Sequence, residues 1–247
     1  MNIRSLLKRF IPYHWSAYYR AKKDIILFTG GRVFQGPFAG MQYFAASGDW
    51  TDCAMLLGLY ERELTPIIQQ AVQGRWTRFI EIGCAQGYYA IGIALKAPSS
   101  VEVIAFEANP EALVEARKKA VANNVDERIV WKGTANSEEL DGLHLSARDL
   151  LFVDIDGGER DLLVPSRSPS LSNCDILVET HDFLDRGISD ELKQRFHDTH
   201  SIEEIVWRPV QRAEMPYPEA TDTHALCVNG RPPLSWLWME ARKKNIA

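Results

Sequence analysis

The sequence contains few cysteines and no long hydrophobic run. Only four of its 247 residues are cysteine, at positions 53, 84, 174 and 227, and no two of them form a Cys-x-x-Cys pair. No histidine cluster has the spacing of a zinc site. No apolar run approaches the roughly 18 residues of a membrane span, and the N-terminus lacks the features of a signal peptide. We therefore expect a protein without structural zinc that works in the reducing cytoplasm.

The sequence also lacks an excess of positive charge. It has 28 basic and 33 acidic residues, which gives a net charge of -5. Nucleic acid is therefore not an expected partner. Residues 1–25 differ, since this aromatic-rich segment holds six basic residues against one acid, Asp24. We expect it to be a solvated helix packed on its own domain. Contact with an anionic membrane surface is the less favoured alternative.

From Arg78 onward, short apolar runs alternate with helical patterns. Five runs predict buried strands, at 79–82, 101–107, 128–133, 150–156 and 175–180, and the run 201–210 predicts a sixth strand. Such alternation predicts a parallel sheet with right-handed crossovers. A seventh run, 224–230, follows a proline-containing connection without room for a helix, so it predicts an antiparallel last strand.

The predicted fold class is therefore α/β, with a Rossmann-like, mostly parallel sheet of seven strands whose last strand is antiparallel. Residues 1–75 are predicted to form an N-terminal helical cap, with helices near 16–28 and 52–72, and residues 76–247 form the sheet domain. The C-terminal stretch 235–247 combines an aromatic stripe with a basic run. It predicts a terminal helix or arm docked on the body, or an oligomer contact; the oligomeric state itself is not predicted.

The first predicted strand ends in a glycine loop, Glu81-Ile-Gly83-Cys-Ala85-Gln-Gly87. Ligands of open parallel sheets bind at the carboxyl ends of the strands, and small residues let a ligand approach the backbone. Glu107 ends the second strand 20 residues after Gly87. There its carboxylate can accept hydrogen bonds from ribose hydroxyls, which predicts a nucleotide ligand.

The charge of the loop distinguishes two nucleotide ligands. A dinucleotide needs GxGxxG to hold its pyrophosphate at a helix N-terminus, but Ala85 and Tyr88 replace the second and third glycines. Glu81 would also bring negative charge near the phosphates. S-adenosylmethionine carries a sulfonium and an ammonium group and no phosphate, so a carboxylate suits it. An S-adenosylmethionine site is favoured; an NAD-dependent oxidoreductase on a similar fold is the alternative.

Three segments between about Arg78 and Gly230 resemble the FkbM-type group of class I S-adenosylmethionine-dependent methyltransferases. EIGCAQG is similar to an acid-x-Gly-Ala-Asn-x-Gly loop, AFEANP (105–110) to AFEPNP, and DIDGGERDLL (154–163) to DVEGxExxVL. The chain departs from these patterns at Gln86, Ala108 and Asp156, and it has Phe152 where a lysine often stands. The resemblance implies that residues 76–247 form a methyltransferase domain, and it leaves the substrate subfamily open.

The resemblance also implies which residues contact the cofactor. They are Glu81, Gly83, Cys84, Ala85 and Gly87 on the methionine and ribose side, Glu107 at the ribose, Ala108 and Asn109 beside the adenosine, and Thr134 and Ala135 at the adenine edge. Cys84 needs only to be small and buried there, and a catalytic thiol is not expected. The helix that contains Tyr60 would cover the cofactor, or it is an ordinary amphipathic cap helix.

Two predicted strands end in polar residues that should meet at one edge of the sheet. These residues are Asp154 and Asp156 after the fourth strand, and Glu179, His181 and Asp182 at the end of the fifth. We predict that Asp154 and His181 are catalytic, with His181 as the base, and that Asp156 and Glu179 contact the substrate. Helix capping by the aspartates is the structural alternative. Activation by Mg²⁺ on oxygen ligands is less favoured, so no metal is expected.

The predicted reaction moves a methyl group from S-adenosylmethionine to an oxygen, an in-line displacement in which positioning dominates. FkbM-type relatives mostly methylate hydroxyls of sugars or secondary metabolites, so the resemblance implies a small-molecule acceptor such as a sugar or glycoside. Arg212 and Tyr217, before the last predicted strand, would shape acceptor choice. A nucleic-acid methyltransferase and a non-catalytic binding module are further alternatives. His197 and His200 are expected to be exposed.

Overall fold

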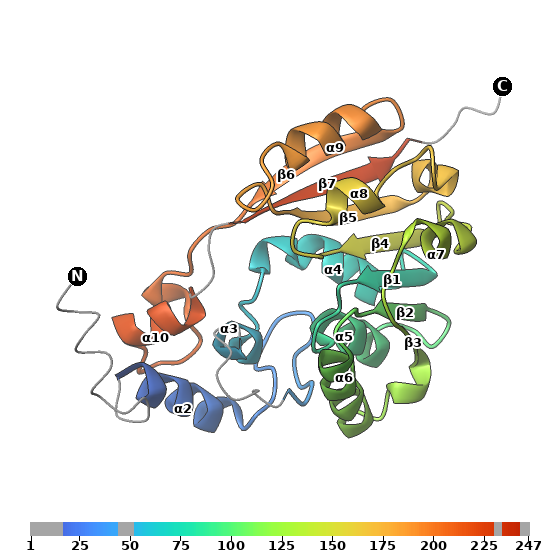
Figure 1. The fold of residues 1–247 in the computed structure, drawn as a ribbon. Coiled ribbons are helices and arrows are strands. Elements are labelled where there is room, and N and C mark those ends of the chain that lie inside the picture. The colour runs from blue at the N-terminus through green and yellow to red at the C-terminus, as the bar shows by residue number, and fades with distance from the viewer. Residues whose placement is uncertain (1–16, 44–51, 230–233, 243–247) are drawn as a thin grey trace. The chain divides into compact units, whose positions relative to one another are not determined.

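The computed structural model describes residues 17–43, 52–229 and 234–242 (Figure 1). The chain divides into a helical unit, Met1–Arg62 with Arg208–Pro232, and a sheet unit, Glu63–Trp207 with Pro233–Ala247. This division differs from a boundary after residue 75, because 63–75 belong with the sheet and 208–232 with the N-terminal helices. Packing of a helical cap over the sheet stays a prediction. The membrane-contact alternative concerns mainly residues 1–16, which lie outside the described residues.

The sheet unit holds seven strands in the order β3-β2-β1-β4-β5-β7-β6 (Figure 1). They are β1 (Arg78–Ile82), β2 (Glu102–Phe106), β3 (Ile129–Lys132), β4 (Asp149–Val153), β5 (Asp175–Thr180), β6 (His200–Val206) and β7 (Ser235–Ala241). β1 pairs in parallel with both β2 and β4, so the strand order reverses there. β7 is antiparallel to β5 and β6. The predicted Rossmann-like sheet with an antiparallel last strand is confirmed.

Helices cover both faces of this sheet (Figure 1). They are α4 (Thr65–Val72), α5 (Tyr88–Lys96), α6 (Pro110–Ala122), α7 (Ser137–Gly142), α8 (Glu159–Leu162) and α9 (Ile188–Phe196), with short 3-10 turns at Asp126–Arg128 and Pro169–Asn173. One core cluster joins Ile80 of β1 to α7, α8 and α9. On the opposite face, the Phe152 ring of β4 lies 4.6 Å from Tyr89 of α5 and 4.9 Å from Trp236 of β7. Strand side chains alternate between the two faces of the sheet. Because helices cover both faces, the side chains on both are apolar.

The last strand is not where the sequence patterns predicted it. The stretch 224–230 was expected to be a strand, but it falls largely in helix α10 (Asp222–Val228). Thr221 and His224 form a capping box at its start, and the buried residues His224 and Cys227 lie on one helical face. The segment that its alternating pattern predicted to be a strand is therefore largely part of a short amphipathic helix.

The prediction of a helix or arm at 235–247 is wrong for its described part, because Ser235–Ala241 is β7. β7 lies between β5 and β6, so it is an interior strand of the sheet. Trp236 and Leu237 are buried, at 1% and 0% exposure. Because the side chains of a strand alternate between the two faces, two consecutive buried residues are typical of a strand covered on both faces.

The helical unit contains α2 (Ala17–Thr29), α3 (Asp52–Leu57), a 3-10 turn at Arg212–Glu214 and α10, which contacts α2 and α3. The helix expected near 16–28 is confirmed by α2, whereas the helix expected over 52–72 is broken after α3. Gly58 has φ +67°, and a Cβ there would lie 2.0 Å from the Gln35 carbonyl oxygen. A 3-10 turn, Arg62–Leu64, and α4 follow. Within the described ranges, no helix has the length and apolarity to cross a bilayer.

Candidate functional site

The loop after β1 lies at the carboxyl edge of the sheet, where the strand order reverses. Gly83 has φ +88°, and a Cβ on it would lie 1.7 Å from the carbonyl oxygen of Asp154. Only glycine fits so close to another backbone at a positive φ. Gly87, at φ +80°, is the N-cap of α5. The loop therefore lies directly against the end of β4.

Most backbone amides of this loop are already engaged. The Gly83 and Cys84 N–H groups donate to the last carbonyl of β2, at 3.0 and 2.9 Å. The Gly87 N–H donates to the Cys84 carbonyl oxygen at 2.6 Å, and the Ala85 N–H donates to Oε2 of Glu107 at 2.7 Å. A phosphate at a glycine loop needs such amides as free donors. The loop therefore suits a ligand whose hydrogen bonds are made to groups other than these amides.

Glu107 links the loop after β1 to the loop after β2. Besides the Ala85 amide, its carboxylate accepts the Asn109 N–H through Oε1 at 2.7 Å. The side chain is half-buried, and an ionised carboxylate has about four acceptor positions. Glu107 therefore keeps lone pairs for hydroxyl groups of a ligand.

Two of the predicted loop-side residues are buried. Glu81 is 2% exposed and shares its face of β1 with Phe79, because strand side chains alternate. Cys84 is 3% exposed. Burial, and after it the negative charge of Glu81, raises the pKa of the Cys84 thiol far above its usual range. The thiol stays protonated and serves packing, as predicted for a small buried residue.

The other predicted cofactor residues of the sheet unit lie on the loops after β2 and β3. Ala108 is exposed, and Asn109 caps α6, because its Oδ1 accepts the Glu111 N–H at 2.9 Å. Thr134 is exposed, while Ala135 packs against the core cluster. Asn109 therefore has a structural role in addition to any contact with a ligand.

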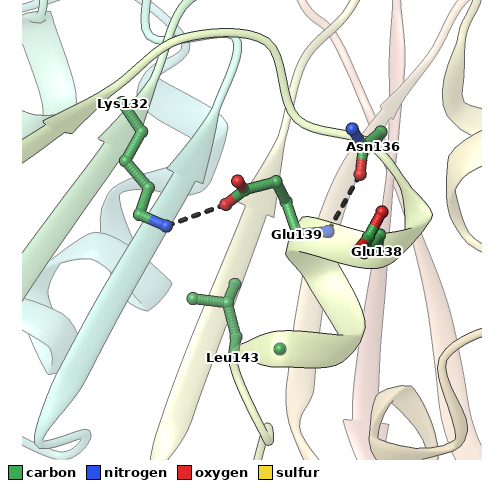
Figure 2. A pocket seen from close by; sticks show the side chains of 6 residues that line it. Lys132, Asn136, Glu138, Glu139 and Leu143 are labelled. Carbon is green, nitrogen blue, oxygen red and sulfur yellow. Dashed lines mark hydrogen bonds and ion pairs between the residues drawn. The ribbon is translucent and has the colours of Figure 1, made fainter.

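A pocket of about 460 Å³ adjoins the loop after β3 (Figure 2). Its lining residues are Lys132, Asn136, Glu138, Glu139, Gly142 and Leu143. Lys132 Nζ lies 2.8 Å from Glu139 Oε2, and Asn136 Oδ1 accepts the Glu139 N–H at 2.9 Å (Figure 2). Thr134 and Ala135 lie between Lys132 and Asn136 in the chain. The pocket, which the sequence patterns did not indicate, is thus close in the chain to the predicted adenine edge, although neither Thr134 nor Ala135 lines it.

Three predicted site residues belong to the helical unit: Tyr60, Arg212 and Tyr217. Arg212 is exposed, and the Tyr217 ring lies 5.1 Å from that of Phe28 and 5.0 Å from that of His224. Tyr217 is thus part of an aromatic group within its own unit. A contribution of these residues to a site on the sheet unit stays a prediction.

At the ends of β4 and β5, one imidazole lies among four carboxylates. His181 Nδ1 is 2.6 Å from Oε1 of Glu159. Its Nε2 is 3.6 Å from Oδ1 of Asp154, 3.4 Å from Oδ1 of Asp156 and 3.4 Å from Oε2 of Glu179. The structure brings together four of the residues predicted at this edge and adds Glu159.

The cluster is buried on one side and open on the other. The side chains of His181, Glu159 and Glu179 are 2%, 0% and 1% exposed, whereas those of Asp154 and Asp156 are 27% and 90% exposed. Small molecules and ions can therefore approach past Asp156.

Glu159 controls the protonation of the imidazole. Burial opposes a charged ring, but the hydrogen bond and the charge of Glu159, followed by the charges of Asp154 and Asp156, raise the pKa of His181. Burial also opposes a charged Glu159, yet its hydrogen bonds with His181 and with backbone amides, including that of Gly157, lower the pKa of its carboxyl. The pair is thus a carboxylate held firmly against Nδ1 of the ring.

Two residues near the cluster differ from expectation. Asp182 points to the start of α9, where its Oδ1 accepts the Gly187 N–H at 3.1 Å and the Ser189 hydroxyl at 3.1 Å, so it shapes a loop. Glu159 was not singled out from the sequence, although it is the third acid in the matched segment DIDGGERDLL. Its place on a short helix directed back to β5 could not be seen from spacing alone.

The prediction of an exposed His200 is wrong. It is 1% exposed on β6, with Nε2 2.9 Å from the Cys174 carbonyl oxygen and Nδ1 2.8 Å from the Thr199 hydroxyl. Burial lowers the pKa of His200. His197 is exposed, as predicted.

No protein-family model matches the chain. Among the solved structures that share its fold are two O-methyltransferases. An S-adenosylmethionine-dependent O-methyltransferase from Thermotoga maritima superposes with a TM-score of 0.53 at 17% identity, over 80% of this chain and 73% of that one. The O-methyltransferase TomG from Streptomyces achromogenes, solved with S-adenosylmethionine, gives 0.52 at 14% identity, over 91% and 99% of the two chains. At these identities the similarity shows the Rossmann-like fold.

Proposed function

We propose that the chain is an S-adenosylmethionine-dependent methyltransferase that acts on an oxygen of a small molecule. The occupied amides of the glycine loop carry this proposal, because a dinucleotide phosphate would need them free. The acids Glu81 and Glu107 beside the loop favour a cationic ligand over an anionic one. The two fold relatives, which are described as O-methyltransferases, support the same activity.

The residues present fit this cofactor. Gly83 and Gly87 let a ligand approach the backbone, and Glu107 has lone pairs left for ribose hydroxyls. We assign its binding to Glu81, Gly83, Cys84, Ala85, Gly87, Glu107, Ala108, Asn109, Thr134, Ala135 and Asp154, with Tyr60 as a cover. The pocket is lined by Lys132 and Asn136, which flank Thr134 and Ala135 in the chain, and this supports an adenine edge nearby (Figure 2).

The bound cofactor would supply an electrophilic methyl group. The chain itself has to hold the acceptor hydroxyl and receive its proton. We assign this step to the cluster that contains His181 and Asp154, and contact with the acceptor to Asp156 and Glu179. The Asp154 carbonyl touches the glycine loop, which supports a cofactor and an acceptor side by side.

We further propose that the acceptor is a sugar or glycoside hydroxyl, that Arg212 and Tyr217 contribute to its choice, and that the chain is an FkbM-type enzyme of the cytoplasm. The FkbM-type motifs support the acceptor class. All four cysteines are buried thiols outside disulfides, which supports a reducing setting. Methyl transfer to a panel of sugars, glycosides and small phenols would identify the acceptor class. Transfer to phenols alone would contradict the sugar proposal.

Calorimetric titration of the purified chain tests the cofactor. S-adenosylmethionine and S-adenosylhomocysteine should each bind at one site, while NAD⁺ and NADH should give no saturable heat. Tight binding of NAD⁺ without S-adenosylmethionine would overturn the proposal in favour of an oxidoreductase.

A further inference from the structure

We propose that Asp154, Asp156 and His181 bind one divalent transition-metal ion such as Co²⁺, Mn²⁺ or Zn²⁺ in preference to Mg²⁺ or Ca²⁺. One donor atom from each of these residues lies within 4.8 Å of the other two. The inference goes beyond methyl transfer, since it depends on the cluster and not on the reaction.

The separations around Nε2 of His181 are those of co-ligands. Three carboxylate oxygens, from Asp154, Asp156 and Glu179, lie 3.4 to 3.6 Å from it. A hydrogen bond from an imidazole N–H would bring one oxygen to about 2.7–3.2 Å. Tetrahedral ligands with bonds of about 2.0–2.2 Å lie about 3.3–3.5 Å apart. The ring nitrogen is thus spaced for a cation between it and the oxygens.

His200 is a buried histidine whose two ring nitrogens both have close oxygen partners. Both ring nitrogens of His200 lie within 2.9 Å of an oxygen partner. In His181 only Nδ1 has such a short contact, although the ring is buried to a similar degree. The difference lies at Nε2, the atom that faces the carboxylates.

Glu159 holds the ring in the orientation that a metal ligand needs. Its Oε1 accepts from Nδ1 at 2.6 Å and also from the Gly157 N–H at 3.1 Å. In the neutral ring with its hydrogen on Nδ1, that N–H donates a hydrogen bond to Glu159. Nε2 then carries the lone pair that binds a metal. A buried carboxylate behind a ligating imidazole is the usual outer shell of such sites. Among the residues that the structure describes, the other oxygen of Glu159 is buried and has no hydrogen-bond partner.

The donor set determines which ions fit. Mg²⁺ and Ca²⁺ prefer oxygen ligands alone, whereas Mn²⁺, Co²⁺ and Zn²⁺ also accept imidazole nitrogen. The exposed side chain of Asp156 leaves a path for the ion to enter. Combined with the proposed function, the ion would activate the acceptor hydroxyl in place of a free imidazole base.

Cobalt binding to the full chain tests this inference without any turnover. After dialysis against EDTA and its removal, Co²⁺ should give one calorimetric site and visible d–d absorption. Mg²⁺ and Ca²⁺ should bind at least about tenfold more weakly than Co²⁺. Equal affinity for Mg²⁺, or no saturable Co²⁺ site, would overturn the inference.

Variants locate the ion. Asp156→Asn changes an exposed side chain that the fold does not need, and it should weaken Co²⁺ binding by more than about tenfold. His181→Asn should remove the site, subject to a check of folding by circular dichroism. The exposed pair His197 and Asp198 supplies the controls, so His197→Asn and Asp198→Asn should bind Co²⁺ like the parent. Parent-like binding in Asp156→Asn would place the ion elsewhere and refute this site.

Discussion

The sheet unit uses carboxylates in two different ways at neighbouring strand ends. After β1 and β2, both oxygens of Glu107 accept backbone N–H groups at 2.7 Å. After β4 and β5, three carboxylate oxygens stand 3.4 to 3.6 Å from Nε2 of His181. The Glu107 carboxylate is held by two short hydrogen bonds within the protein, whereas the oxygens around Nε2 of His181 lie beyond the usual hydrogen-bond distance from it.

This difference separates two kinds of mutant. Changes at the glycine loop should alter the fold and the cofactor affinity together, because the same contacts serve both. Changes on the open side of the cluster should alter ligand binding and leave the fold intact.

The largest effect is expected for Gly83→Ala. The added Cβ would overlap the Asp154 carbonyl oxygen at 1.7 Å, at a φ of +88° that alanine rarely adopts. We expect a loss of at least about 3 kcal/mol in the free energy of unfolding, measured by urea denaturation, and no S-adenosylmethionine binding. Gly142→Ala is the control for stability alone, since nothing lies within 4 Å of a Cβ there. A stable Gly83→Ala with normal affinity would contradict the described loop.

Next is Glu107→Ala, which removes the acceptor proposed for ribose hydroxyls. Loss of two hydrogen bonds to a charged group costs about 2–4 kcal/mol, so S-adenosylmethionine should bind about 30-fold to several-hundred-fold more weakly. Calorimetry measures this, with the exposed Glu111→Ala as the control. Because Glu107 also holds the loop amides, thermal stability should fall as well. Unchanged affinity in a folded variant would remove Glu107 from the site.

A smaller effect is expected for Glu159→Gln in the cluster. The amide keeps the shape of the side chain but weakens its hold on Nδ1 of His181, and outer-shell changes of this kind cost about 10- to 100-fold in metal affinity. Cobalt titration measures the loss, and the exposed Glu138→Gln is the control. If Glu159→Gln and the control bound Co²⁺ equally, Glu159 would have no role behind the imidazole.

His200 provides a modest, pH-dependent effect. Its pKa is lowered in the folded protein, so below the ordinary histidine range the unfolded chain binds a proton that the native state does not. The stability that His200 contributes is therefore present at neutral pH and lost as the pH falls. Urea unfolding between about pH 8 and 5 should show a steeper decline for the parent than for His200→Gln. His197→Gln should follow the parent, and identical slopes in all three would refute the assignment.

The smallest effect is expected in the helical unit. Tyr217→Phe keeps the ring contacts with Phe28 and His224 but removes the hydroxyl. With Arg212→Ala, it should raise the KM for the acceptor a few-fold and leave the Kd for S-adenosylmethionine unchanged. A change in cofactor affinity with a normal acceptor KM would contradict a role in acceptor choice.

Local patterns were sufficient to predict much of the sheet. β1 to β6 and the loop from Glu81 to Gly87 follow from buried apolar runs and a glycine turn, which are properties of short segments. The cluster was predictable in part, because parallel strands deliver their ends to one edge and so unite Asp154 with His181.

The remaining features depend on partners distant in the chain. Ser235–Ala241 is a strand because β5 and β6 leave a place for it, which no local pattern records. His200 is buried because β7 and the Cys174 carbonyl cover it, although the preceding His197 is exposed. Glu159 belongs to the cluster because α8 turns back toward β5, and sequence spacing does not show that turn.

The placement of β7 between β5 and β6 has a consequence for synthesis on the ribosome. In the described sheet, β6 is hydrogen-bonded to β7 alone, yet it is translated before the segment 207–234 and before β7. Until β7 leaves the exit tunnel, β5 presents an open edge and β6 has no neighbour, and such edges attract other chains. A nascent chain halted between β6 and β7 should therefore be a target for chaperones.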